Sequence, residues 1–137
     1  MQIQNWQIKE HLKYDSNNFW VAIEGQQALI GLTDYGQWVI GDILYIEIGK
    51  VGAILQKGES FGSVESGKWV GNLIAPISGQ VIACNNTAVD DPHQIQADPY
   101  GIGWLIKVDL ASDREICTLF DCVDYANFVK EQVKNAA

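Results

Sequence analysis

The sequence predicts a mainly β domain, a sandwich or barrel of short strands with helices at its C-terminal end. Two observations favour this fold class. Apolar, β-rich runs alternate with glycine-containing turns at a spacing of roughly eight to twelve residues, and a long stretch with helical spacing of apolar residues occurs only near the C-terminus. The chain has 137 residues, of which 47% are apolar. That is enough for one core, so we expect a single domain over 1–137 with a helical segment at about 112–137.

The first part of the chain predicts a hairpin and then a short helix. Within residues 14–28, a β-rich run at 20–24 leads into a turn at 24–26, and a second apolar strand follows at 28–32. Thr33 then offers an N-cap for a short helix. Further strands are expected at 41–48, 51–58, 59–66, 69–75 and 80–84. Pro76 ends one of these runs, because it cannot donate to a strand ladder.

The last third predicts two helical regions around one strand. Pro92 marks the start of one or two helical turns that reach Ala97. Residues 104–108 are the last expected strand. Ser112 and Glu115 stand at capping-box spacing and predict a helix that continues to Lys134. The expected apolar face of that helix comprises Phe120, Val123, Tyr125, Phe128 and Val129.

Composition excludes several classes of function. The formal net charge is −8, so the domain repels phosphate backbones and nucleic acid is not an expected partner. No apolar run approaches the ~18–20 residues of a membrane span, and the N-terminus lacks a targeting pattern, so we expect a cytoplasmic protein. The three cysteines have no disulfide or zinc spacing and are expected to be ordinary, partly buried residues: Cys84, Cys117 and Cys122.

The chain has few residues with which to catalyse a reaction. Its only histidines are His11 and His93, and it has no nucleophile elbow, phosphate-binding loop or zinc-protease motif. Three aspartates are expected to form a solvated acidic loop rather than a metal site: Asp90, Asp91 and Asp98. We therefore expect neither catalytic nor metal-binding residues.

One lysine stands at a distinctive place. Gly67 and Lys68 form the expected tight turn between two apolar strands, and glycine suits such a turn because it accepts positive φ. A side chain at such a tip points away from both strand ladders, so the amine of Lys68 is accessible. From this local pattern alone, an ordinary surface lysine in a polar turn is the favoured interpretation.

The wider sequence resembles the glycine cleavage H-protein family over roughly residues 10–130. The segments that carry the resemblance follow one another at compatible spacing: 14–21, 31–35, 65–68, 75–79 and 98–107. The resemblance implies a lipoyl-domain-like hammerhead β-sandwich, also called a barrel-sandwich hybrid, with flanking short helices and a C-terminal helix. It implies covalent N6-lipoylation of Lys68, with Glu65 and Gly79 helping the attaching enzyme recognise the hairpin.

The same resemblance implies a monomeric carrier that catalyses nothing itself. Its expected partners are a lipoate ligase or lipoyl transferase, and the enzymes between which the lipoyl arm moves. No nucleic acid or membrane is expected to take part.

The chain departs from the family pattern near the lysine. Asn18-Phe19-Trp20 stands where the family has His-Glu-Trp, Trp69 follows the lysine in place of alanine, and Asn72 replaces a common acidic residue. We expect Asn18, Phe19 and Trp69 to line a cleft or a partner surface near the arm. The alternative, that the two aromatic side chains only pack in the core or the hairpin, stays open.

These departures favour one branch of carriers. They resemble the lipoate-binding proteins of sulfur oxidation, which work with a heterodisulfide-reductase-like complex. The alternative is a glycine cleavage H-protein that carries the aminomethyl group between the glycine cleavage enzymes. A relay protein that donates lipoate to other carriers, and an unmodified interaction module, are further alternatives.

Overall fold

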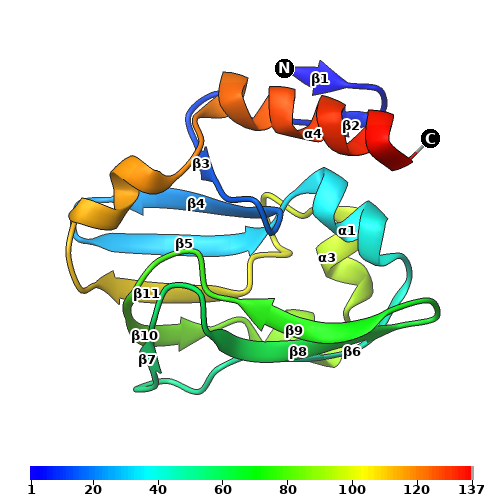
Figure 1. Cartoon of the computed structure of the whole chain (residues 1–137). Helices are drawn as coiled ribbons and strands as arrows, with labels where there is room; N and C mark the ends of the chain where they lie inside the picture. Colours follow the sequence, from blue (N-terminus) through cyan, green and yellow to red (C-terminus); the bar gives the residue numbers. More distant parts are fainter. Residues whose placement is uncertain (137) are drawn as a thin grey trace.

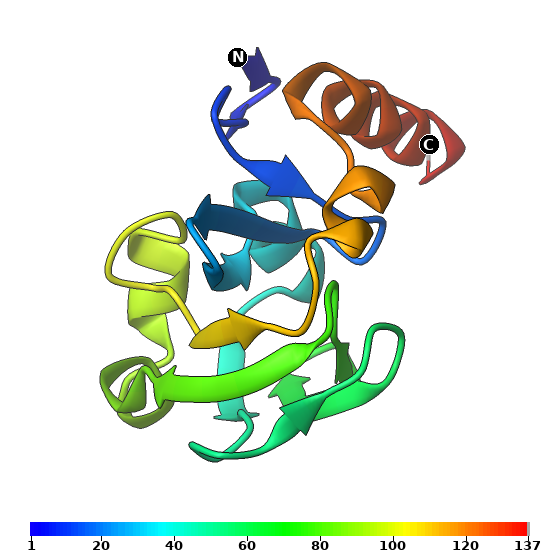
Figure 2. The ribbon, with the colours of Figure 1, turned by 90° about the vertical axis from the view of Figure 1, so that its left-hand side faces the viewer.

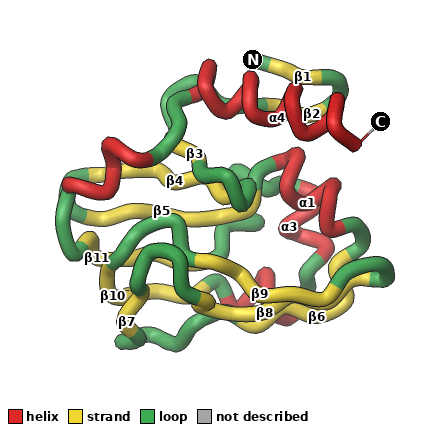
Figure 3. Tube along the Cα trace, viewed as in Figure 1, coloured by secondary structure: helices red, strands yellow, loops and turns green. Residues whose placement is uncertain are grey.

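The computed structural model describes residues 1–136 and confirms a mainly β fold with short helices and a C-terminal helix. Figure 1 shows two layers of strands, with helices at one end and the C-terminal helix α4 (Cys122–Ala136) across the top. Figure 3 shows how much of the remaining chain is loop. No helix within the described residues has the length and apolar character needed to cross a membrane.

The larger layer is an antiparallel sheet that curves around the core. Its six strands, in spatial order, are β3 (Lys13–Tyr14), β4 (Phe19–Glu24), β5 (Gln27–Leu32), β11 (Ile106–Leu110), β10 (Gly79–Cys84) and β7 (Ile54–Leu55). β10 and β11 pair with a register shift between Val81 and Ala83. The expected turn at 24–26 is present, and Gly25 adopts φ +62° there.

The smaller layer has three antiparallel strands and faces the larger sheet. They are β6 (Ile43–Glu47), β8 (Ser60–Ser66) and β9 (Val70–Ile74), with β8 in the centre. A separate pair at the N-terminus, which the sequence did not predict, consists of β1 (Gln2–Ile3) and β2 (Trp6–Gln7). Figure 2, a view turned by 90°, shows the domain from the end at which β10 and β11 lie.

Short helices connect these strands. α1 (Asp34–Ile40) begins as predicted, because the Thr33 hydroxyl accepts a hydrogen bond of 2.9 Å from the Gly36 N–H. α3 (His93–Ala97) matches the helical turns expected after Pro92. The remaining helical elements are α2 (Asn86–Asp90), which the sequence did not predict, and the 3₁₀ helix η1 (Arg114–Thr118).

Two clusters of buried side chains hold the domain together. The main core lies between the two sheets and draws on both layers, as Val21 of β4 and Leu73 of β9 illustrate. A second cluster joins α4 to the outer face of the larger sheet, where the rings of Tyr14 and Tyr125 stack with centroids 4.4 Å apart. The C-terminal helix is therefore part of the same folded unit.

The C-terminal segment differs from the predicted single helix. Glu115 does not close a capping box, because its carboxylate accepts hydrogen bonds from the Ser78 N–H at 2.6 Å and the Ser78 hydroxyl at 2.9 Å. The helical path is broken where Tyr14 and Phe120 exchange two backbone hydrogen bonds of 2.9 and 2.7 Å. α4 begins only after this break, so Phe120 is not part of the helix. Val123 is part of it but is exposed and does not join the expected apolar face.

The three cysteines differ in their burial. Cys117 is exposed rather than partly buried, whereas Cys84 is partly buried and Cys122 is buried. Ala137, the last residue of the expected helical segment, lies outside the described residues.

The β8–β9 hairpin also differs in detail from its prediction. Three residues, 67–69, separate the two strands, one more than in the expected two-residue turn. Gly67 is not among the glycines with positive φ, so the turn does not need glycine for that reason. Gly79 is different, because a Cβ built on it would overlap the backbone carbonyl of Asp109 on the neighbouring strand β11.

These two glycines give a matched pair for mutation. We expect Gly79→Ala to lower the free energy of unfolding by about 1–3 kcal/mol, because β10 must move away from β11 to make room. Gly67→Ala should change it by less than about 0.5 kcal/mol, since nothing lies within 4 Å of the added carbon. Urea denaturation of both variants tests this, and equal stabilities would contradict the close approach at Gly79.

Candidate functional site

Lys68 lies at the tip of the β8–β9 hairpin, which projects farthest to the right in Figure 1. Its side chain is exposed and crosses Gly41 so closely that a Cβ added to this glycine would lie 2.7 Å from the lysine Cε. The ammonium lies 5.7 Å from the centre of the Trp38 ring, within the range of a cation–π contact. Among residues 1–136 the ion pairs join His93 to Asp42 and Asp91, so no carboxylate holds this amine.

Sequence reasoning missed Gly41 and Trp38 as neighbours of the lysine. Gly41 ends α1 with φ +88°, and a helix followed by glycine is a recognisable C-terminal signal. That the same glycine leaves room for the stem of Lys68 follows only from the tertiary structure. Without a side chain at this point, the lysine lies close along the end of α1.

The backbone of the tip is held by one buried hydroxyl. Ser66 Oγ donates a hydrogen bond of 2.6 Å to the carbonyl of Ile40, the last residue of α1. The same oxygen accepts hydrogen bonds from the N–H groups of Trp69 at 3.0 Å and Lys68 at 3.3 Å. The residues around Lys68 are thus hydrogen-bonded to α1 as well as within their own hairpin, while the amine itself stays exposed.

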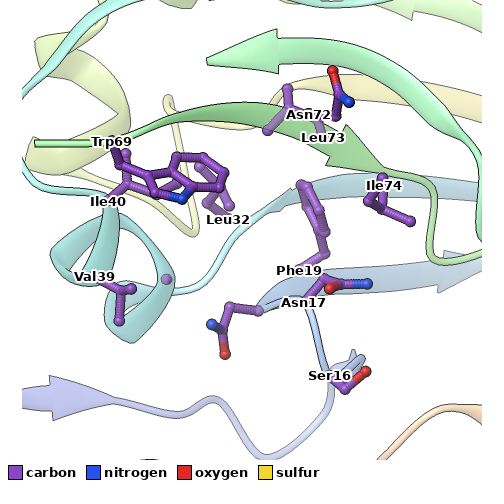
Figure 4. A pocket seen from close by; sticks show the side chains of 12 residues that line it. Ser16, Asn17, Phe19, Leu32, Val39, Ile40, Trp69, Asn72, Leu73 and Ile74 are labelled. Atoms are coloured by element: carbon purple, nitrogen blue, oxygen red, sulfur yellow. The ribbon is translucent and has the colours of Figure 1, made fainter. Parts of the chain in front are cut away.

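A cleft of about 350 Å³ lies beside the tip. Figure 4 shows Trp69 on one wall and Phe19 below it, with Leu73 and Ile74 of β9 on the far side. Every lining residue is uncharged: Ser16, Asn17, Asn18, Phe19, Leu32, Gly36, Val39, Ile40, Trp69, Asn72, Leu73 and Ile74. The structure therefore brings together the three residues proposed for a cleft, namely Asn18, Phe19 and Trp69.

Two of these residues also have a packing role. Phe19 is buried in the main core, and its ring lies 5.6 Å from the ring of Phe61, so it forms the floor of the cleft and part of the core at once. Trp69 is 43% exposed and leans over Gly71, where a Cβ would clash with its indole. The packing interpretation thus holds for Phe19 without excluding its place in the cleft.

Asn18 is hydrogen-bonded to the C-terminal helix α4. It adopts φ +68°, and its side-chain oxygen accepts a hydrogen bond of 2.9 Å from the Tyr125 hydroxyl. That hydroxyl has one proton, so Thr33, whose oxygen lies 2.7 Å away, donates to it in turn. This chain of hydrogen bonds ties the rim of the cleft to α1 and to α4.

A second, smaller hollow of about 250 Å³ adjoins the first and shares Ser16, Asn17 and Ile74 with it. Asp15 lines this hollow, and its carboxylate accepts hydrogen bonds from the Phe19 N–H at 2.9 Å and the Asn17 N–H at 3.1 Å. Burial raises the pKa of Asp15 to about 6, although these hydrogen bonds and the nearby Lys57 oppose the shift.

The two expected recognition residues lie in different settings. Glu65 is exposed on β8, close to the tip, and pairs across the sheet with Tyr45 and Val70. Gly79 is buried at the start of β10, which lies at the left of Figure 1, opposite the tip at the right. The structure brings Glu65 near the lysine and does not bring Gly79 there.

The site can supply an accessible primary amine next to an uncharged cleft. A deprotonated lysine amine is a nucleophile that an activated acyl group can modify. Within residues 1–136, no three His, Cys, Asp or Glu side chains are arranged to hold a metal ion.

Comparisons with known proteins agree with one another. The sequence profile of the family described as Glycine cleavage H-protein matches residues 12–132. The chain is 38% identical to the glycine cleavage system H protein of Carboxydothermus hydrogenoformans, over 91% of this chain and 96% of that protein. It is 42% identical to the same-named protein of Synechococcus sp., over 88% and 93% of the two chains.

A solved structure shows the same fold. The crystal structure of a glycine cleavage system H protein from Mycobacterium marinum superposes with a TM-score of 0.80 and 36% sequence identity. The match covers 88% of this chain and 97% of that one.

The pKa of Asp15 leads to a prediction for stability. Between about pH 4 and pH 6, Asp15 is mostly protonated in the native state and mostly ionised in the unfolded chain. The free energy of unfolding therefore falls as pH rises through that window. Asp15→Asn should remove this contribution, because an amide does not ionise and its oxygen still accepts both hydrogen bonds. Urea denaturation between pH 4 and pH 7 measures both proteins, and a constant difference between them would contradict the raised pKa.

Proposed function

The chain belongs to the glycine cleavage H-protein family, and on that premise we propose that it is a lipoyl carrier of a glycine cleavage system, with lipoate attached to Lys68. The observation that carries the proposal is an exposed amine beside an uncharged cleft, on a hairpin tip that Ser66 holds to α1 by a hydrogen bond. Its proposed cargo is the aminomethyl group, and its partners are the enzymes that load and unload it. The chain itself has no catalytic role in this proposal.

The residues around Lys68 fit a covalent lipoyl group. The amine has no carboxylate partner among the described ion pairs, so amide formation breaks no ion pair. Only the cation–π contact with Trp38 depends on the charge that acylation removes. Apolar side chains that line the cleft, such as Leu73 and Ile74 on the side away from the tip, offer a place where an apolar arm can rest against the domain.

The protein's part in the mechanism is positioning. Lipoate supplies a strained cyclic disulfide whose sulfurs undergo reduction and carry the transferred group. Ser66 fixes the point from which the arm extends, which limits the volume that the arm searches. Trp69 and Phe19 give the cleft beside it an apolar wall and floor.

The relatives favour glycine cleavage over sulfur oxidation as the pathway of this carrier. All those compared above are glycine cleavage system H proteins, and none supports the sulfur-oxidation branch favoured by the departures in sequence. Glycine cleavage is therefore the first candidate. A monomeric state, a cytoplasmic location and the identity of the attaching enzyme stay predictions.

One observation still favours sulfur oxidation as a second candidate. Phe19 and Asn72, which stand where the family commonly has acidic residues, both line the cleft beside the tip. A cleft without carboxylates gives no ionic partner to the protonated amine of an aminomethyl cargo, whereas an uncharged sulfur cargo needs none.

Reconstitution separates these two candidates. With lipoylated chain, glycine and the glycine-decarboxylating and aminomethyl-transferring enzymes of the native host, the first candidate predicts steady release of carbon dioxide. No release above that of the unmodified chain would leave the sulfur pathway as the better assignment.

Replacing the lysine tests the attachment point. Wild-type chain from its native host should show a mass increase of about 188 Da on the peptide that contains Lys68, as expected for a lipoyl amide. Lys68→Arg should abolish the increase and leave thermal unfolding nearly unchanged, because an exposed side chain contributes little to stability. Lys130→Arg, on the exposed face of α4, is the control and should remain modified. Modification at another lysine, or at none, would refute the assignment.

A further inference from the structure

Large apolar side chains are exposed around the attachment lysine. Two short segments next to Lys68, 38–45 and 69–70, contribute six of them, each between 42% and 71% exposed. We call these six residues the collar: Trp38, Val39, Leu44, Tyr45, Trp69 and Val70. Val39 and Trp69 line the same cleft, and the Trp38 ring lies 5.7 Å from the Lys68 ammonium. Exposed apolar side chains gathered in this way are typical of an interaction site.

Part of the collar forms a regular row on the sheet. Tyr45 of β6 lies opposite Glu65 of β8, which in turn lies opposite Val70 of β9. Tyr45 and Val70 are 69% and 71% exposed, so neither contributes much to the core. The row places one carboxylate between two apolar side chains, close to the tip that carries Lys68.

Within the two stretches of chain that contain the collar, the charges are almost all negative, and His93 lies 3.4 Å from one of the carboxylates, that of Asp42. In the segments 38–47 and 60–74, which contain the collar, the acidic residues are Asp42, Glu47 and Glu65, and Lys68 is the one basic residue. A partner that matches this surface has an apolar mouth bordered by arginine or lysine side chains.

The position of the reacting atom identifies the partner. An enzyme that attaches an acyl group must reach Nζ itself, which is only about 6 Å from the lysine backbone. It therefore has to contact the residues that surround the tip. An enzyme that acts on the far end of a long arm can dock at a greater distance.

We propose that the collar is the surface by which the lipoate-attaching enzyme holds the unmodified chain, with Tyr45 and Val70 as its main apolar contacts. The proposal rests on the function proposed above and adds the surface that selects this partner. In the reaction, Nζ leaves Trp38, gives up one proton to solvent to become a neutral amine and attacks the carbonyl carbon of a lipoyl adenylate. A second proton leaves Nζ for solvent as the amide forms. The C–N bond forms as the C–O bond to AMP breaks, and nothing is oxidised or reduced.

The test measures the rate of modification rather than the activity of the loaded carrier. Unmodified full-length chain is incubated with lipoate, ATP, Mg²⁺ and a purified lipoate–protein ligase, and intact mass is followed with time at several chain concentrations. Tyr45→Ser and Val70→Ser should each lower kcat/KM at least about fivefold, mainly through KM, because they remove uniform binding. Val51→Ser and Ile54→Ser are matched controls, 66% and 67% exposed outside the collar, and should stay within about twofold of wild type.

The outcomes separate the two proposals. Modification of all four variants at the wild-type rate would overturn the collar as the docking surface while leaving Lys68 as the attachment point. The proposal is also overturned if Tyr45→Ser and Val70→Ser are modified at the wild-type rate but bind the glycine cleavage enzymes poorly. The collar would then be a docking surface for those enzymes and not for the lipoate-attaching enzyme. Failure of the ligase to modify even the wild-type chain would count against the proposed function itself. Equal loss in the control variants would show a general effect of surface serines and would also overturn the collar.

Discussion

The hydrogen bonds of the Ser66 hydroxyl are the interaction on which the rest of the site depends. They join the hairpin tip to the end of α1, so the backbone of Lys68 has a fixed position relative to the cleft. The side chain of Lys68 is left out of this arrangement and keeps an exposed amine. A carrier needs both properties, because a loose tip would enlarge the volume searched by an arm, and a buried amine could not be modified.

The cleft shows how the same residues serve stability and the site. Phe19 packs in the main core and also forms the floor of the cleft. Asn18 at its rim is held by Tyr125 of α4, whose hydroxyl is in turn bonded to the N-cap residue Thr33 of α1. The C-terminal helix therefore supports the site from a distance, although it contributes no side chain to the cleft.

The sequence was sufficient for features that depend on local chemistry. The turn at Gly25, the N-cap at Thr33 and most strands follow from neighbouring residues, and the lysine tip follows from its position between two apolar runs. Features that depend on distant partners were missed. Glu115 bonds to Ser78 instead of capping a helix, and Phe120 pairs with Tyr14, so the predicted long helix is broken. Contacts of this kind between residues far apart in sequence leave no local pattern.

The same distinction applies to the site. Asn18, Phe19 and Trp69 could be singled out because they depart from a family pattern, and the fold brings them to one cleft. Gly41 and Trp38 could not, because their contact with the Lys68 stem depends on how α1 meets the hairpin. The site depends on a rigid tip backbone that carries an exposed amine. NMR relaxation of backbone amides in the unmodified chain tests it most directly. A rigid tip predicts order parameters near 0.85 for residues 67–69, as in the strands, and values below about 0.6 there would contradict it.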